Sequence, residues 1–72
     1  MKNIKIVILG LNFGRTIAEE IYNGVENIEL YGVCDIDKEK AHGYAAKYNV
    51  KEFHSIEEVL ADDNVTAVGV FT

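Results

Sequence analysis

A five-residue turn near the start of the chain carries residue types that bind phosphate groups. It reads Gly10-Leu11-Asn12-Phe13-Gly14 and lies between a run of aliphatic residues and a segment with helical periodicity. A strand that enters a helix through a glycine turn points the unpaired N–H groups of the first helical turn at the space above the strand end. Anions bind readily at such helix N-termini. The turn therefore predicts a phosphate site.

Asp35 stands where a nucleotide-binding turn needs an acidic partner. In the dinucleotide fingerprint, G-x-G-x-x-G is followed about 20 residues later by an acidic residue that accepts hydrogen bonds from a ribose. Asp35 lies 21 residues after Gly14, at the end of a second apolar run. Two structural alternatives remain open. The glycines can form a plain turn with nothing bound, and Asp35 can be a solvated carboxylate that caps the next helix.

The turn departs from the fingerprint at its second glycine. It is one residue shorter, and Asn12 stands where that glycine belongs. Asparagine tolerates positive φ, so the turn can still form, but its side chain is expected to crowd a diphosphate approaching the backbone. Phe13 and Arg15 complete the candidate site. Arg15, on the first helical turn, either faces a cofactor phosphate or is solvated.

The same residues offer a second interpretation, as a P-loop of the pattern G-x-x-x-x-G-K-[ST]. The match through Gly14-Arg15-Thr16 is one residue short, and an arginine replaces the lysine that reaches the terminal phosphates. The dinucleotide interpretation is therefore favoured.

Cysteine and histidine offer little further chemistry. Cys34 is the single cysteine and has no cysteine or histidine at metal-binding spacing. We interpret it as a small buried apolar residue in a reducing compartment. His42 and His54 are isolated in the sequence and are expected at the surface. We predict no metal site and no catalytic residue in this chain.

Length, hydropathy and charge narrow the class of protein. Seventy-two residues make at most one small domain, which buries only roughly 60% of its unfolded surface. The longest apolar run is far below the roughly 18 residues that span a bilayer, and the N-terminus lacks a signal-peptide cleavage site. A net charge of −5 argues against a nucleic-acid or anionic-membrane surface. We expect a cytoplasmic protein without nucleic-acid or membrane partners.

Strands and helices are expected to alternate along the chain. Near-continuous aliphatic runs predict buried parallel strands, and apolar residues at i, i+3 and i+4 predict helices that pack on them. The expected strands cover about residues 2–9, 28–34, 50–54 and 65–71. The first expected helix covers about residues 13–23, and the second lies between the cap Asp37 and the stop Asn49. The third is a short helix that begins with a Ser55–Glu58 capping box. Its inward residues are expected to be Ile56, Val59 and Leu60.

This alternation is typical of right-handed βαβ crossovers and predicts an α/β fold. We expect a Rossmann-like, doubly wound parallel sheet with four strands in the order 3-2-1-4, an incomplete half of a larger domain. Ligands bind such sheets where the winding reverses, at the carboxyl ends of strands one and four. By strand counting, that edge collects Gly10, Asn12, Gly14, Asp35 and Thr72.

Three stretches that cover essentially all of the chain are similar to a known family: KIVILGLNFGRTIAEEI, ELYGVCDIDKEKAHGYAAKYNV and FHSIEEVLADDNVTAVGVFT. Through them the chain resembles the N-terminal dinucleotide-binding domain of the glucose-fructose oxidoreductase and inositol dehydrogenase (Gfo/Idh/MocA) family. The most specific part of this resemblance is the run HSIEEVLADDNVTAV, from His54 to Val68. That run is similar to the family stretch Y-S-S-x-E-E-L-L-x-D-x-x-V-D-A-V.

The resemblance implies the nucleotide-binding part, residues 1–72, of an NAD- or NADP-dependent oxidoreductase acting on a sugar, polyol or related small molecule. In that family the catalytic lysine lies in an E-K-P motif after a fifth strand, and a following α+β domain holds the substrate. We therefore expect this chain to be a fragment or truncated form. The competing hypothesis is a stand-alone nucleotide-binding or interaction module without catalysis.

Two further expectations concern the cofactor and the sheet edge. Asp35 predicts NAD rather than NADP, because a 2′-phosphate would lie against its carboxylate. The fourth strand would leave an open edge, for which we expect self-association or cover by a C-terminal domain.

Overall fold

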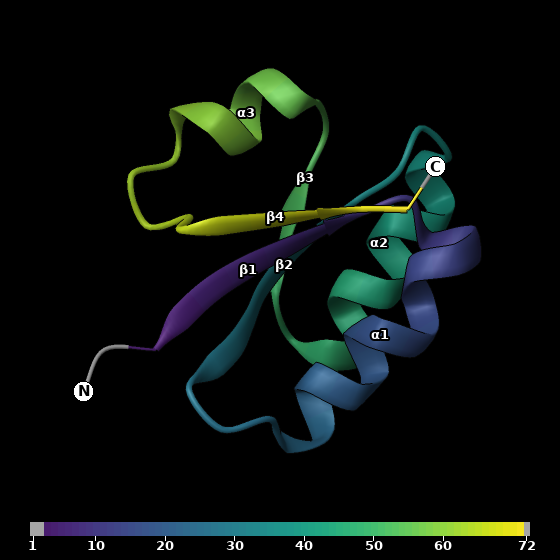
Figure 1. Ribbon diagram of the computed structural model, residues 1–72. Coiled ribbons are helices and arrows are strands. Elements are labelled where there is room, and N and C mark those ends of the chain that lie inside the picture. Colours follow the sequence, from purple (N-terminus) through teal and green to yellow (C-terminus); the bar gives the residue numbers. More distant parts are fainter. Residues whose placement is uncertain (1–2, 72) are drawn as a thin grey trace.

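Strands and helices alternate through residues 3–71, the part of the chain that the computed structural model describes (Figure 1). The strands are β1 (Ile4–Leu9), β2 (Ile28–Cys34), β3 (Lys51–Phe53) and β4 (Ala67–Val70). The helices are α1 (Leu11–Gly24), α2 (Lys38–Tyr48) and α3 (Ile56–Ala61). β3 and β4 are shorter than predicted, and α1 begins directly after Gly10 rather than at Phe13.

The four strands form one parallel sheet in the order β3-β2-β1-β4. This confirms the predicted order 3-2-1-4. In the register of the sheet, Ile8 lies opposite Val33 on one side and Gly69 on the other. Because all strands run in the same direction, their carboxyl ends meet at one edge.

Helices cover the sheet unequally on its two faces. Figure 1 shows α1 and α2 together on one face and α3 alone on the other. Between the sheet and the first two helices, Ile8 and Ala18 are fully buried, and on the opposite face Val7 and Val59 are fully buried. Burial of a side chain of the size of valine or isoleucine contributes about 1.5–3 kcal/mol. These two clusters hold the sheet in place under the site described below.

Three helix-end signals in the sequence operate as predicted. The Asp37 side chain accepts a hydrogen bond from the N–H of Lys40 at 3.2 Å and caps the start of α2. Asn49 caps the end of α2 in a left-handed conformation with φ 54°. Ser55 Oγ accepts from the N–H of Glu58 at 3.2 Å. In the second hydrogen bond of this capping box, Glu58 Oε1 accepts from the N–H of His54 at 3.1 Å rather than from the N–H of Ser55.

Two residues of α3 that were predicted to face inward are exposed instead. Ile56 and Leu60 are 48% and 73% exposed, whereas Val59 is fully buried. A helix of six residues presents little more than one side chain to the sheet, so its remaining apolar residues face outward. On the same side of the sheet Val68 and Val70 of β4 are also exposed.

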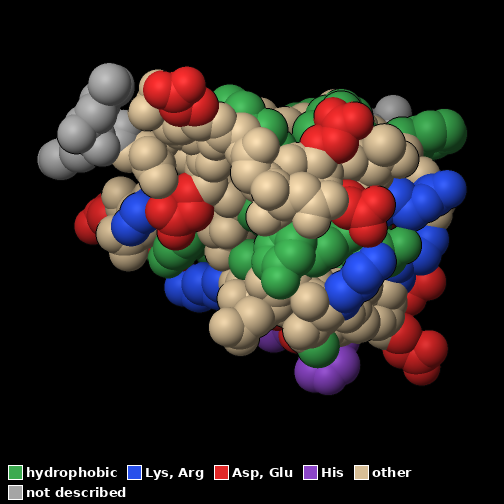
Figure 2. Space-filling view, turned by 90° about the horizontal axis from the view of Figure 1, so that it is seen from below, with side chains coloured by type: hydrophobic (Ala, Val, Ile, Leu, Met, Phe, Trp, Pro, Cys, Tyr) green, Lys and Arg blue, Asp and Glu red, His purple; other side chains and the backbone are tan. Residues whose placement is uncertain are grey.

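The surface mixes both signs of charge with apolar side chains. On the face shown in Figure 2, acidic and basic side chains surround an exposed apolar patch. Among residues 3–71, no helix combines the length and the apolar character needed to cross a membrane.

Candidate functional site

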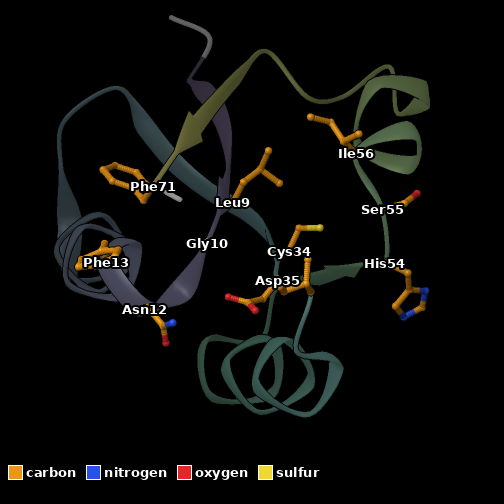
Figure 3. Close-up of a pocket in the computed structure, with 11 residues that line it drawn as sticks. Leu9, Gly10, Asn12, Phe13, Cys34, Asp35, His54, Ser55, Ile56 and Phe71 are labelled. Carbon is orange, nitrogen blue, oxygen red and sulfur yellow. The ribbon is translucent and has the colours of Figure 1, made fainter.

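A cavity of about 400 Å³ opens at the carboxyl edge of the sheet (Figure 3). Every strand end contributes to it, and so does the start of α1. It is lined by Leu9, Gly10, Asn12, Phe13, Cys34, Asp35, Ile36, His54, Ser55, Ile56 and Phe71. Most of its wall is apolar. The polar side chains lie at the start of α1, after the end of β2 and after the end of β3.

Gly10 forms the turn between β1 and α1. Its φ of 89° and ψ of 94° lie in a region that residues with a side chain rarely adopt. Its N–H donates to the carbonyl of Cys34 at 3.0 Å, and its carbonyl accepts from the N–H of Gly14 at 2.9 Å. The turn therefore joins β1 to β2 and lets α1 begin immediately after β1.

The first turn of α1 presents backbone donors to the cavity. The N–H of Leu11 donates to Asp35 Oδ2 at 2.7 Å. Within the described part of the chain, no acceptor lies in hydrogen-bond range of the N–H groups of Asn12 and Phe13. Two donors of a helix N-terminus are therefore left for a ligand, and the partial positive charge of that terminus favours an anion.

Asp35 forms the opposite side of the polar region. Its second oxygen, Oδ1, accepts from the N–H of Asp37 at 2.8 Å. Burial raises the pKa of this carboxyl, but the hydrogen bonds from Leu11 and Asp37 and the charge of Lys40 lower it more, so the pKa is below its ordinary value. The carboxylate is therefore ionised at neutral pH, and its remaining lone pairs can accept from hydroxyl groups.

Asn12 does not occupy the position of a second glycine in the turn. It is a helical residue of α1, and the residues other than glycine that have positive φ are Asn27 and Asn49 in the described chain. Its exposed side chain accepts, through Oδ1, a hydrogen bond from the ammonium group of Lys40 on α2. Asn12 is helical, and not part of the turn as expected, because α1 already begins at Leu11.

Two other predicted site residues lie outside the cavity wall. Gly14 lies on the buried face of α1. A Cβ atom at this position would lie 2.6 Å from Ile8 Cγ2 and 3.0 Å from Phe71 Cδ2. Gly14 thus permits close packing of α1 on the sheet. Arg15 is exposed, and its guanidinium donates to the carbonyl of Asn12. Thr72, also predicted for this edge, lies outside the described residues.

The apolar half of the cavity was not predicted from the sequence. Phe71 closes one side, Cys34 and Ile36 flank Asp35, and Ile56 follows β3. The Ile36 side chain is fully exposed next to the carboxylate. The rule that ligands bind at strand ends could have identified these residues, because each of them ends a strand or lies within three residues after one.

His42 and His54 are at the surface, as predicted, but they are not isolated in space. His42 Nδ1 lies 3.0 Å from Glu52 Oε1, and His54 Nε2 lies 3.3 Å from Glu52 Oε2. The hydrogen bond from His42 lowers the pKa of Glu52. Figure 3 shows the His54 ring at the rim of the cavity, directed away from Asp35. In residues 3–71, no group of three or more histidine, cysteine or acidic side chains is arranged to hold a metal ion.

Comparison with known proteins relates this architecture to oxidoreductases. The family model GFO_IDH_MocA, described as an oxidoreductase family with an NAD-binding Rossmann fold, matches residues 4–72. A search of curated proteins gave no significant match.

Solved structures match the whole length of the chain. An NAD-binding protein from Listeria innocua is 35% identical over 99% of this chain, with a TM-score of 0.82. UDP-N-acetylglucosamine 3-dehydrogenase GnnA from Acidithiobacillus ferrooxidans is 29% identical over 100% of this chain, with a TM-score of 0.81. GenD2 from gentamicin A biosynthesis, solved in complex with NAD, has a TM-score of 0.84 over 100% of this chain at 24% identity, which shows a shared fold. The chain covers 21%, 23% and 21% of these three structures, respectively.

Proposed function

This chain belongs to the Gfo/Idh/MocA family of oxidoreductases and is an NAD-binding Rossmann domain, and we propose that its cavity holds the adenosine diphosphate half of NAD. The observation that carries the proposal is the pairing of donors and acceptor across one cavity. Free N–H groups of Asn12 and Phe13 lie on one side, and the ionised carboxylate of Asp35 lies on the other.

The residues around the cavity fit this half of the cofactor. A diphosphate needs donors and a backbone that can approach closely, which the free amides of α1 and the glycine at position 10 supply. A ribose needs an acceptor for its hydroxyl groups, which Asp35 supplies. The apolar side chains Ile36 and Ile56 offer surfaces on which an adenine ring can pack.

The described residues take part in binding and orientation only. When NAD is bound, it supplies the hydride acceptor of an oxidation. Asp35 would hold the ribose, and the α1 amides would hold the diphosphate.

We propose that the parent enzyme oxidises or reduces a sugar, polyol or related small molecule. Support comes from the family and from the 29% identical dehydrogenase, which acts on a nucleotide-linked amino sugar. The alternative of a stand-alone interaction module gains no support from these comparisons. A cytoplasmic location is also proposed, on the basis of the lone buried thiol of Cys34.

We further propose that additional polypeptide, or a second copy of the chain, covers β4. This chain covers 23% and 21% of two solved relatives, which supports the view that it forms the N-terminal part of a larger enzyme. Val70 is 61% exposed beside the unpaired edge of the sheet. Such an edge recruits another strand or chain.

Calorimetric titration of the chain with ADP-ribose, NAD and nicotinamide mononucleotide tests the proposed site. We expect ADP-ribose and NAD to bind with similar affinity and nicotinamide mononucleotide not to bind. Asp35→Ala should abolish most of the ADP-ribose signal, whereas Asp63→Ala, in an exposed turn, should leave it unchanged. Absence of NAD and ADP-ribose binding by the folded wild-type chain would refute the proposal.

A further inference from the structure

Lys40 reaches from α2 to the start of α1. It lies in the first turn of α2, where its N–H donates a hydrogen bond to Asp37 Oδ1 at 3.2 Å. A cation is disfavoured at a helix N-terminus because that end of the helix carries a partial positive charge. A hydrogen-bond acceptor for the Lys40 ammonium group offsets this cost. The ammonium group finds one in Asn12 Oδ1, 28 residues away in sequence. Lys40 is partly buried, whereas Lys38 on the same helical turn is exposed.

This contact determines which end of the Asn12 amide is free. A lysine ammonium group can only donate hydrogen bonds, so the oxygen of Asn12 must face it. The NH₂ group of the amide is left without that partner and remains a donor. Figure 3 shows the amide nitrogen of Asn12 on the side of Asp35 and the oxygen directed away from the cavity.

We propose that Asn12 and Lys40 together form a diphosphate-recognition pair, in which Asn12 Nδ2 donates to the cofactor and Lys40 orients the amide. The inference rests on the proposed function, because it assumes that the diphosphate of NAD lies over the start of α1. Asn12 then adds a side-chain donor to the two free backbone N–H groups. The Asn12 side chain, which was expected to crowd the diphosphate, thereby binds it.

The charge of Lys40 also acts on Asp35, which agrees with a role of Lys40 in diphosphate binding. The charge of Lys40 contributes to the low pKa of Asp35, so the ammonium group lies within electrostatic range of both the carboxylate and the amide. It therefore reduces the repulsion that an ionised Asp35 would exert on an incoming diphosphate. Lys40 acts as a positioning residue and Asn12 as a binding residue.

The test uses a ligand series in which only some members carry the diphosphate. Affinities of ADP-ribose and adenosine are measured by titration for wild type, Asn12→Ala, Lys40→Met, Lys40→Arg and the control Lys38→Met. We expect Asn12→Ala and Lys40→Met to weaken the binding of ADP-ribose about tenfold and that of adenosine less than about twofold. Asn12→Ala removes the proposed hydrogen bond to the diphosphate, and Lys40→Met removes the contact that orients the Asn12 amide. Lys40→Arg should restore most of the affinity, and Lys38→Met should match wild type.

The outcomes separate this inference from the proposed function. If wild type fails to bind ADP-ribose, the proposed function is refuted together with the inference. If wild type binds and Lys40→Met behaves as Lys38→Met does, the inference alone is refuted. Equal weakening of adenosine and ADP-ribose also refutes it, because a general loss of structure would act on both ligands. Circular dichroism of each variant confirms that the fold is retained.

Discussion

Asp35 at the end of β2 accepts a hydrogen bond from the N–H of Leu11 at the start of α1, with 2.7 Å between Oδ2 and the nitrogen. One carboxylate therefore serves two purposes. It satisfies a backbone donor of α1 that has no partner within the helix, and it is the acceptor that we propose for the ribose. The hydrogen bond thus ties this carboxylate to the start of α1, where we propose that the diphosphate binds.

The first prediction concerns the choice between NAD and NADP. A 2′-phosphate about 4 Å from the Asp35 carboxylate is repelled by roughly 4 kcal/mol at an effective dielectric constant of 20. The charge of Lys40 reduces this repulsion, so we expect wild type to bind NAD at least about tenfold more tightly than NADP, which corresponds to about 1.4 kcal/mol. Asp35→Asn should bring the ratio close to one, and Asp63→Asn should leave it unchanged. Titration with both cofactors measures the ratio. Equal or tighter binding of NADP by wild type contradicts the assignment of Asp35.

The second prediction assigns a packing role to Gly14. A methyl group there would meet Ile8 Cγ2 at 2.6 Å, whereas at Gly43, in the middle of α2, no atom lies within 4 Å. We expect Gly14→Ala to lower the free energy of unfolding by about 1–3 kcal/mol, the usual effect of overpacking. Gly43→Ala should raise it by about 0.5–1 kcal/mol, because alanine favours the helix. Urea unfolding followed by circular dichroism compares the two. Equal effects of the two variants would show that the tight contact at Gly14 is not a constraint.

The third prediction is a loss of stability in acid that depends on Asp62. Its side chain, 7% exposed, accepts hydrogen bonds from Lys51 Nζ at 2.8 Å, the Tyr31 hydroxyl at 2.9 Å and the N–H of Asn64 at 2.9 Å. The bond from Lys51, followed by the other donors, lowers the pKa of Asp62 to about 2. Because this is below the value of about 3.9 in the unfolded chain, the stabilisation is present above about pH 4 and is lost as the pH falls towards 2. Asp62→Asn should remove it.

Urea unfolding at neutral pH and at about pH 3 measures this effect. The difference in unfolding free energy between wild type and Asp62→Asn should shrink in acid. Asp63→Asn, next to it in the exposed turn, serves as the control and should differ from wild type by the same small amount at both pH values. A difference for Asp62→Asn that does not change with pH contradicts the prediction.

The fourth prediction is that the Cys34 thiol is unreactive in the folded protein. Burial, and then the nearby charges of Asp35 and Glu58, raise its pKa, so little thiolate is present at pH 8. We expect its reaction with an aromatic disulfide reagent to be at least about tenfold slower in the native chain than in urea. Since Cys34 is the single cysteine, the absorbance change reports on this site alone. Equal rates in the folded and unfolded states would show that the thiol is accessible.

The fifth prediction is association through β4. Val68 and Val70 are 36% and 61% exposed on the edge strand. We expect the weight-average mass in sedimentation equilibrium to rise between low and high micromolar concentration, because an unprotected apolar edge pairs with another chain. Val70→Lys should suppress the rise, and Tyr22→Lys, an exposed residue of α1, should not. A monomer at all concentrations in wild type would contradict the prediction.

The sequence alone determined the elements, their order and the edge at which the site lies. Aliphatic runs identify β1 and β2 because residues buried on both faces of a sheet must be apolar throughout. The caps at Asp37, Asn49 and Ser55 were predictable because each depends on residues no more than four positions away. Asp35 was placed at the site by its position after a strand in a parallel sheet.

Tertiary structure decided how those residues are used. The bond from Leu11 to Asp35 and the contact of Lys40 with Asn12 span 24 and 28 positions in the sequence and depend on how α1 and α2 are set against the sheet. The packing role of Gly14 likewise depends on how closely α1 approaches β1. These distances follow from side-chain packing between elements, which the periodicity of any one segment does not contain.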